Sequence, residues 1–572
     1  MLFTFVLLST FTHSMQNATD HDDNPYIAAA KVTAEEGLIP YRDYRLIHMP
    51  YYVFVYALIF KFTSSVTLVM RIISFLAFST LLILVFRSIQ KSMAGRNQIF
   101  KFLTGASAIF FILYSPEVNY AFARFTYDIP LLLSILAFLL LTSIVAGNKL
   151  FLKAFLSGLF MGVAIGFRLH FVLFAIPFGL AVLLFLNLSL SLRLKLLLWF
   201  SAGIFAGLIP VIVLFLIAPR EIIFDVFQFH FSIDTQFLDH QKRLFTFGER
   251  LREFYGLIRQ TWHTSVLFFG VLWLAGLRVL RAFRHVKDDI LNFSLAMILI
   301  TLPFLIYLAI GKILIYQYLY PLVIVSILGF FYGLSTLKKY ANIATLVVSI
   351  LAFLMLWQGD PLRLEELKKP EDWAAVSRHR SSLLIDEALS GHTRILTLSP
   401  AEIVESDSIL IYKEFVSSPF LWRTSYLIPD QKREQLNIIS EKDIKSFLQE
   451  NQPDAIFTGY EWEVLEKSFI EFARENGYTE IDITNTRDLN LYIRSKYYSI
   501  LFLYKYPVIK QTPFLQPVTD ACPHDPQPVF YATLQVYGGS LPEIAGGTGN
   551  LSDIKTCIED LCDHLVIEYK II

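Results

Sequence analysis

The sequence contains very little cysteine and carries no net charge. Its only three cysteines, Cys522, Cys557 and Cys562, show no Cys-x-x-Cys spacing and no flanking histidine pattern. This argues against a cysteine metal site and leaves a disulfide among them open. Basic and acidic residues both number 49. The bulk charge therefore gives no reason to expect a nucleic-acid partner.

The polar balance of a soluble domain is also missing. Hydrophobic residues make up 55% of the chain, with 52 phenylalanines, which predicts an integral membrane protein. A run of roughly 20 apolar residues predicts a spanning helix, because a helix pairs its backbone polar groups within lipid. We count about eleven such runs, near 2–15, 66–86, 102–115, 129–146, 154–167, 171–187, 197–218, 265–283, 290–310, 319–336 and 341–357. The segment 51–62 is too short to span and predicts an interfacial or re-entrant helix.

The first apolar run lacks the features of a cleaved signal peptide. No basic residue precedes it, and no small-x-small cleavage site follows it. At 1.5 Å per residue it reaches only about 21 Å, against a hydrocarbon core of roughly 30 Å. We therefore expect either a start codon placed too late or a short first helix.

The loops alternate in their content of lysine and arginine. One set is rich in both, as in 87–101 and 278–287, whereas the short loops between them hold one each: Arg124, Arg168 and Lys312. Basic loops stay in the cytoplasm. We therefore expect a multi-pass membrane protein with a cytoplasmic N-terminus. The stretch after the first run, the loop 219–264 and everything after Trp357 would face the periplasm or the cell exterior.

The chain changes character after its last apolar run. Residues 358–495 contain the strand-like runs "TRILTLS", "SILIYKEF", "PDAIFTGY" and "LNLYIRS" among amphipathic segments such as "FIEFARENGY". This alternation predicts a small extracytoplasmic α/β domain with a mostly parallel sheet. Residues 1–357 form the predicted transmembrane domain, and we assign no function to the Pro- and Gly-rich tail 496–572.

The acidic stretch after the first run predicts a helix over 24–36. An aspartate before the helix would cap it and Gly37 would end it, while Glu35 and Glu36 near its end would face water. Asp22 and Asp23 differ, because they follow the first run directly at the membrane surface. A carboxylate at that place could meet a lipid-borne substrate.

Several motifs resemble one known family. The run "DHDDNPYIAAAKVTAEEGLIPYRDY", followed by "HMPYY" and "VMRIISFLAFSTLLILVF", is similar to the start of bacterial C-type (GT-C) glycosyltransferases, the mannosyltransferase and aminoarabinose-transferase-like enzymes that use polyprenyl-phosphate sugars. The segments "SGLFMGVAIGFRLHF" and "GKILIYQYLYPL" add to the resemblance. It covers residues 1–357 and the small outward domain that many members carry. The chain departs from the family in its short first run, two adjacent candidate acids and its tail.

The resemblance implies a polytopic α-helical membrane glycosyltransferase of the bacterial inner membrane. A sugar would pass from a polyprenyl-phosphate donor to a glycan, lipid or protein acceptor on the outer side. Asp22 or Asp23 would be the general base, or Asp22 would bind Mg²⁺ or Mn²⁺. Cations would hold the phosphate. The implied substrate-binding residues are Asp43, Arg124, Asp128, Arg168, His170, Lys312 and Tyr316.

Other interpretations stay open for these residues and for the chain. Each cation could instead extend to the membrane interface, Asp128 could simply cap a helix, and we expect Arg71, inside the second span, to be structural. A transporter or flippase would need charges and broken helices within the membrane. The apolar runs are nearly free of central acids and show no inverted repeat. A non-catalytic subunit of a cell-envelope glycan assembly system would keep the fold without these residues.

Overall fold

A computed structural model describes most of the chain up to residue 494. The described residues are 2–17, 23–93, 95–124, 127–144, 149–185, 188–240, five residues between 246 and 255, 319–335, 341–358, 367–389, 393–400, 403–458, 463–482 and 490–494. They belong to one compact unit, residues 1–508. The predictions on Asp22, Lys312, Tyr316, the runs 265–283 and 290–310, and the tail lie outside the described residues. The predicted boundaries at 357 and 495 stay predictions.

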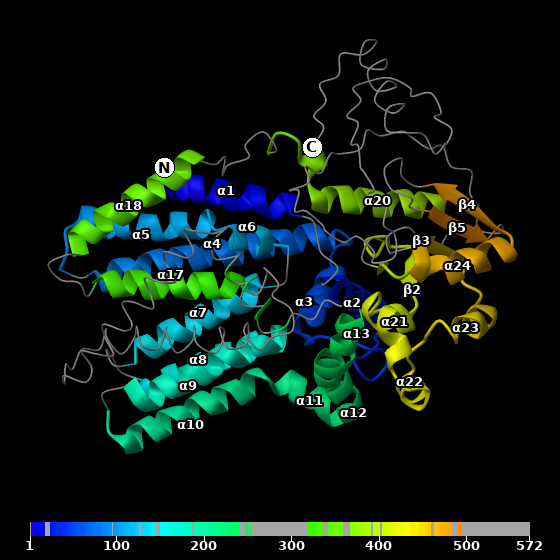
Figure 1. The fold of residues 1–572 in the computed structure, drawn as a ribbon, viewed down its shortest axis with the longest axis horizontal. Coiled ribbons are helices and arrows are strands. Elements are labelled where there is room, and N and C mark those ends of the chain that lie inside the picture. Colours follow the sequence, from blue (N-terminus) through cyan, green and yellow to red (C-terminus); the bar gives the residue numbers. More distant parts are fainter. Residues whose placement is uncertain are drawn as a thin grey trace, which may run out of the picture. The chain divides into compact units, whose positions relative to one another are not determined.

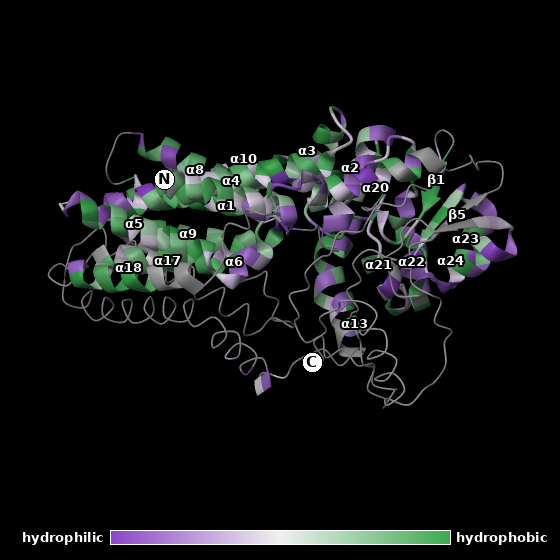
Figure 2. Ribbon diagram, turned by 90° about the horizontal axis from the view of Figure 1, so that it is seen from above, coloured by the Kyte–Doolittle hydropathy of each residue, from purple (hydrophilic) through white to green (hydrophobic). Residues whose placement is uncertain are grey.

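Apolar helices that run side by side form the first part of this unit (Figures 1 and 2). They are α1 (Leu2–Gln16), α4 (Val66–Ser92), α5 (Gln98–Leu113), α7 (Asp128–Thr142), α8 (Leu150–Phe167), α9 (Val172–Phe185), α10 (Leu190–Gly207), α17 (Leu319–Ser335) and α18 (Ala341–Gln358). Within the described part of the chain, α4, α8 and α10 are long and apolar enough to cross a membrane. The mostly helical fold is confirmed, and the count of about eleven spans stays a prediction.

The predicted single span 197–218 is wrong. Helix α10 ends at Gly207, and α11 (Ile209–Ile217) begins after Leu208. Pro210 explains the break, because proline has no backbone N–H to donate and is favoured in the first turn of a new helix. The predicted loop from residue 219 is helical at its start, with α12 (Pro219–Ile222), a π-helix at Ile223–Ile233 and α13 (Asp234–His240).

Glycines allow α8 and α10 to approach each other closely. A Cβ atom on Gly158 of α8 would lie 1.9 Å from the carbonyl oxygen of Phe200, and one on Gly203 of α10 would lie 2.0 Å from that of Phe155. Small residues spaced four apart let the backbones of membrane helices meet in this way. The sequence patterns Gly158-x₃-Gly162 and Gly203-x₃-Gly207 thus define the contact surface of the pair.

The acidic stretch folds into α2 (Asn24–Glu36), a turn and the short helix α3 (Tyr51–Phe60). Gly37 ends α2 in the left-handed conformation with a φ of 69°, as predicted. Asp23 stands at the N-cap position of α2, but its side chain makes no capping hydrogen bond. The predicted capping role is therefore wrong for Asp23.

The second part of the unit is an α/β domain. Its strands are β1 (Thr393–Leu396), β2 (Ile409–Ile411), β3 (Ala455–Thr458), β4 (Tyr478–Asp482) and β5 (Asn490–Arg494), in the order β2-β1-β3-β5-β4. Strand β1 pairs in parallel with β2 and β3, whereas β5 is antiparallel to β3 and β4. The sheet is mixed, and the prediction of a mostly parallel sheet is wrong. The described helices are α20 (Ala374–Ala388), α21 (Phe420–Thr424), α22 (Asp430–Leu436), α23 (Ile444–Asn451) and α24 (Glu463–Glu475).

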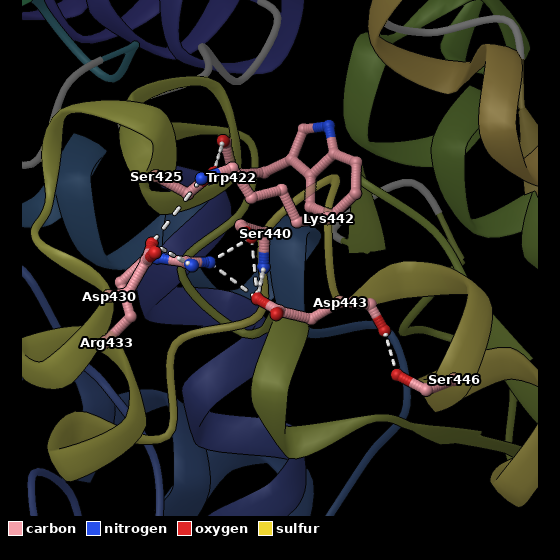
Figure 3. A network of polar contacts seen from close by, with 8 residues as sticks. All are labelled: Trp422, Ser425, Asp430, Arg433, Ser440, Lys442, Asp443 and Ser446. Carbon is pink, nitrogen blue, oxygen red and sulfur yellow. Dashed lines mark hydrogen bonds and ion pairs between the residues drawn. The ribbon is translucent and has the colours of Figure 1, made fainter.

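A polar network fixes α22 within this domain (Figure 3). The buried guanidinium of Arg433 donates to Asp430 at 2.6 Å and to Asp443 at 2.5 Å. Leu436 of α22 shares a hydrophobic core with Ile47 of the first loop and with the π-helix. The network therefore positions the surface on which the α/β domain meets the stretch between α2 and α3.

Candidate functional site

A buried polar cluster lies where the helix ends meet the stretch 23–60 and the α/β domain. Arg71 is near the start of α4, Asp128 opens α7 and Arg168 directly follows α8, so the three belong to one end of the apolar helices. We define the buried polar cluster as Asp23, Tyr26, Tyr52, Tyr56, Arg71, Asp128, Arg168 and Arg378, each of which is at most 9% exposed. Burying so many polar groups is costly unless they pair with each other or with a ligand.

Asp23 is the acid of this cluster that the sequence had suggested as a general base. Its side chain is 3% exposed and interacts electrostatically with Arg71 of α4 and with Tyr56 of α3. Arg378 of α20 acts on the same two residues. The Asp23 carboxylate thus acts on the guanidinium of Arg71 from the apolar helices, and Arg378 from the α/β domain acts on the same guanidinium.

Arg168 lies among aromatic rings. Its guanidinium carbon is 5.4 Å from the ring centre of Tyr26 and 4.9 Å from that of Tyr127. Cation–π contacts of this kind use the faces of the guanidinium, whereas its N–H donors point outward in its plane. The ring of His170 contacts Tyr127 at 5.0 Å. The structure therefore brings the predicted site residues Arg168 and His170 together through Tyr127.

Asp128 connects three segments of the chain. One of its carboxylate oxygens accepts a hydrogen bond from the Tyr320 hydroxyl of α17 at 2.9 Å, and the other accepts one from the Ala123 N–H at 3.1 Å. It is 1% exposed and interacts electrostatically with Tyr52 and Arg71. Asp128 therefore joins α7 to α17 within the cluster.

Two predicted substrate-binding residues have local partners instead. Arg124 lies over the ring of Tyr120, with 4.8 Å from its guanidinium carbon to the ring centre. Asp43 accepts hydrogen bonds from Arg42 and from the Ile39 N–H at 2.7 Å, and the bond from Arg42 holds the pKa of Asp43 below its ordinary value. Their roles in substrate binding stay predictions.

A stack of rings extends the cluster toward the π-helix. The His48 ring lies between Tyr26, at 4.9 Å, and His230, at 5.6 Å. Burial lowers the pKa of His48 well below its ordinary value, so its ring is neutral. His230 contacts the Ile47 carbonyl oxygen at 2.6 Å, and Asp225 accepts from the Leu46 N–H at 3.2 Å. The π-helix thereby fixes the segment that presents His48.

Asp225 predicts a pH dependence of stability. Its side chain is fully buried, and burial raises its pKa to about 7, against the lowering effect of Arg45 and of the Leu46 N–H. Between pH 4 and 7 the folded state therefore holds a proton that the unfolded state has released. Stability is greatest near the acidic end of this range and is lost as the pH rises through 7. We expect the melting temperature of the protein in lipid nanodiscs to fall by several degrees from pH 5 to pH 8.

The control is Asp225→Asn, which keeps the acceptor for Leu46 and removes the titrating group. Its melting temperature is expected to change much less over the same range. Parallel curves for the two proteins would show that Asp225 is not the source of the dependence.

Sequence reasoning missed part of the cluster. The spacing of Tyr52 and Tyr56, four residues apart, indicates one face of a helix and could have pointed to this surface. Arg378 carries no comparable signal, because its place depends on how α20 packs against α4. Arg71 is 5% exposed, and its Nε and Nη2 atoms have no hydrogen-bond partner among the described residues.

Comparison with known proteins gives only distant similarities. No protein-family model matches the chain, and no curated protein matches its sequence. ArnT from Cupriavidus metallidurans, in crystal structures of the apo state and bound to undecaprenyl phosphate, is 12 to 13% identical, with a TM-score of 0.49 and coverage of 86% of this chain and 97% of that chain. The oligosaccharyltransferase of Archaeoglobus fulgidus, solved with Zn and sulfate, is 12% identical with a TM-score of 0.47, over 83% of this chain and 69% of that one.

Both proteins are C-type glycosyltransferases, the family that the sequence motifs resemble. With identities this low and TM-scores below 0.5, the similarity does not say which side chains act or on what substrate. The functional conclusion therefore depends on the residues of this chain.

Proposed function

We propose that this protein is an integral-membrane glycosyltransferase. It transfers a sugar from a polyprenyl-phosphate donor to an acceptor on the extracytoplasmic side. The observation that supports this proposal most is the buried carboxylate of Asp23. It makes no capping bond and interacts electrostatically with Arg71, on which Arg378 also acts, at one end of the apolar helices. The reaction requires an acid and cations at such a place.

The chemistry assigns one role to each kind of group. The Asp23 carboxylate takes a proton from the acceptor as the acceptor attacks the anomeric carbon. The bond between that carbon and the phosphate oxygen breaks, and its electron pair stays on the phosphate. Guanidinium groups stabilise the charge that develops on the leaving phosphate. Attack from the face opposite the phosphate inverts the anomeric centre.

The described residues do not fit a metal site. No group of three or more His, Cys, Asp or Glu side chains that could hold a metal ion occurs among them. Among the described residues, Asp23 interacts with Arg71 and Tyr56, which are not the oxygen-rich carboxylate sets that Mg²⁺ prefers. No step is therefore assigned to a metal, and binding of Mg²⁺ or Mn²⁺ by Asp22 stays a prediction.

The test is transfer by the purified full-length protein in lipid nanodiscs. It is supplied with a panel of polyprenyl-phosphate sugars together with candidate glycan, lipid and protein acceptors, and release of polyprenyl phosphate is followed by mass spectrometry. We expect release from one donor, and accumulation of the same donor in cells that lack the gene. A flippase would move the intact donor between leaflets without cleaving it, and a non-catalytic subunit would do neither. Either result would contradict the proposal.

A further inference from the structure

Arg71 presents an unused pair of donors inside the protein. The side chain is 5% exposed, and its Nε and Nη2 atoms lack a hydrogen-bond partner among the described residues. These two donors form one edge of the guanidinium. In Arg42 the same edge binds both carboxylate oxygens of Asp43, each at 2.8 Å. An anion with two acceptor oxygens would fit the edge of Arg71 in the same way.

A second guanidinium, from the α/β domain, acts electrostatically on Arg71. Arg378 of α20 is 9% exposed and acts on Arg71 as a like charge. Asp23, Tyr56 and Asp128 also act on Arg71. Two neighbouring buried cations repel each other, and an anion between them would relieve this repulsion. Asp23 offsets part of the charge of Arg71, so an anion would be held chiefly through the Nε and Nη2 donors, with Arg378 adding positive charge.

Contacts between the domains hold Arg378 in place. The backbone N–H of Thr67, one turn before Arg71, donates to Glu405 at 2.5 Å. Glu405 also contacts His379, the residue after Arg378, at 3.2 Å. Lys31 of α2 donates to the Ser406 carbonyl oxygen at 2.6 Å. The segment 403–408 thus joins α2 and α4 to the helix that carries Arg378.

We propose that Arg71 and Arg378 form a divided binding site for one phosphate group, completed only when the α/β domain is docked on α4. Two side chains that follow Arg71 on α4, Ile72 and Leu76, are exposed hydrophobics, so this helix also presents an apolar surface. The site therefore suits a phosphate carried on an isoprenoid chain. The choice of this ligand rests on the proposed function, whereas the anion site rests on the two arginines.

The test measures binding of farnesyl phosphate to the full-length protein in nanodiscs by calorimetry, without transfer. We expect Arg71→Gln and Arg378→Gln each to weaken binding by about 10- to 100-fold. The double variant is expected to weaken binding by less than the product of the two single factors. Arg71→Lys keeps the positive charge but lacks the two adjacent N–H donors of the guanidinium. Its affinity for farnesyl phosphate is expected to lie between those of the wild type and Arg71→Gln. If Arg71→Gln does not fold, the binding of Arg71→Lys is compared with that of the wild type instead.

Matched controls lie on the same two helices. Arg87 of α4 and Arg380 of α20 are exposed, and their change to glutamine is expected to leave binding unchanged. Farnesyl phosphate binding at the wild-type level in both Arg71→Gln and Arg378→Gln would overturn the site. Equal affinity for inorganic phosphate would overturn the lipid as its ligand. If the arginine variants lose binding while no donor sugar is transferred, the site stands and the proposed function falls. If transfer occurs and the variants bind normally, the proposed function stands and the phosphate site falls.

Discussion

Replacing Asp23 by asparagine is expected to lower the rate of sugar transfer by roughly 10²–10⁴-fold, the usual contribution of a general base. Asparagine keeps the shape of the side chain but cannot take the proton of the acceptor. Because Asp23 makes no capping hydrogen bond, the change costs α2 no cap. Donor binding is expected to change far less, since the phosphate is held by cations. Single-turnover transfer and donor binding, measured on the same nanodisc preparation, separate the two effects.

Two further variants show whether a loss of transfer is specific to Asp23. Glu36→Gln removes an acid from the other end of α2, where the carboxylate pairs with Arg394 at the surface, and is expected to leave transfer unchanged. Asp22→Asn tests the neighbouring acid, which the sequence alone slightly favours by its position one turn before Tyr26. Near wild-type transfer by Asp23→Asn, with loss in Asp22→Asn, would move the catalytic role to Asp22. Activity in both variants would show that this acidic stretch has no catalytic role.

Replacing Gly203 by valine is expected to abolish the correctly folded protein or to lower its melting temperature strongly. Even the Cβ atom would lie 2.0 Å from the Phe155 carbonyl oxygen and 2.7 Å from the Leu159 nitrogen. Both are backbone atoms of α8 that cannot move away alone, so the helices must separate. Overpacking costs typically about 1–3 kcal/mol and more where backbone is displaced. Fluorescence-detected size-exclusion chromatography after heating measures the loss.

The matched control is Gly179→Ala in α9. A Cβ atom there meets only a methyl carbon of Leu197, at 3.4 Å. We expect this variant to melt close to the wild-type temperature, because a flexible side chain can give way. If Gly203→Val and Gly179→Ala behaved alike, the close approach of α8 and α10 would not be a determinant of stability.

Features that depend on neighbouring residues were predictable from the sequence. Runs of apolar residues predicted the positions of α4, α5, α7, α8 and α9. Each apolar side chain contributes its own favourable free energy of transfer from water into lipid, and these contributions sum along the run. Gly37 ends α2 because glycine adopts a positive φ at little cost. The break at Pro210 was also readable, since proline acts on its own turn. We overlooked it because the hydropathy of the run continues through it.

The tertiary structure alone decided which charged groups meet. Arg71 looked structural within its apolar run, and only the packing of α20 against α4 places Arg378, some three hundred positions later, within electrostatic reach of it. Asp23 stands where a capping residue would, but its side chain makes no capping hydrogen bond. The antiparallel pairing of β5 likewise followed from its place in the sheet. Hydropathy and turn chemistry are properties of a short segment, whereas the partners of a buried charge depend on contacts between residues far apart in the chain.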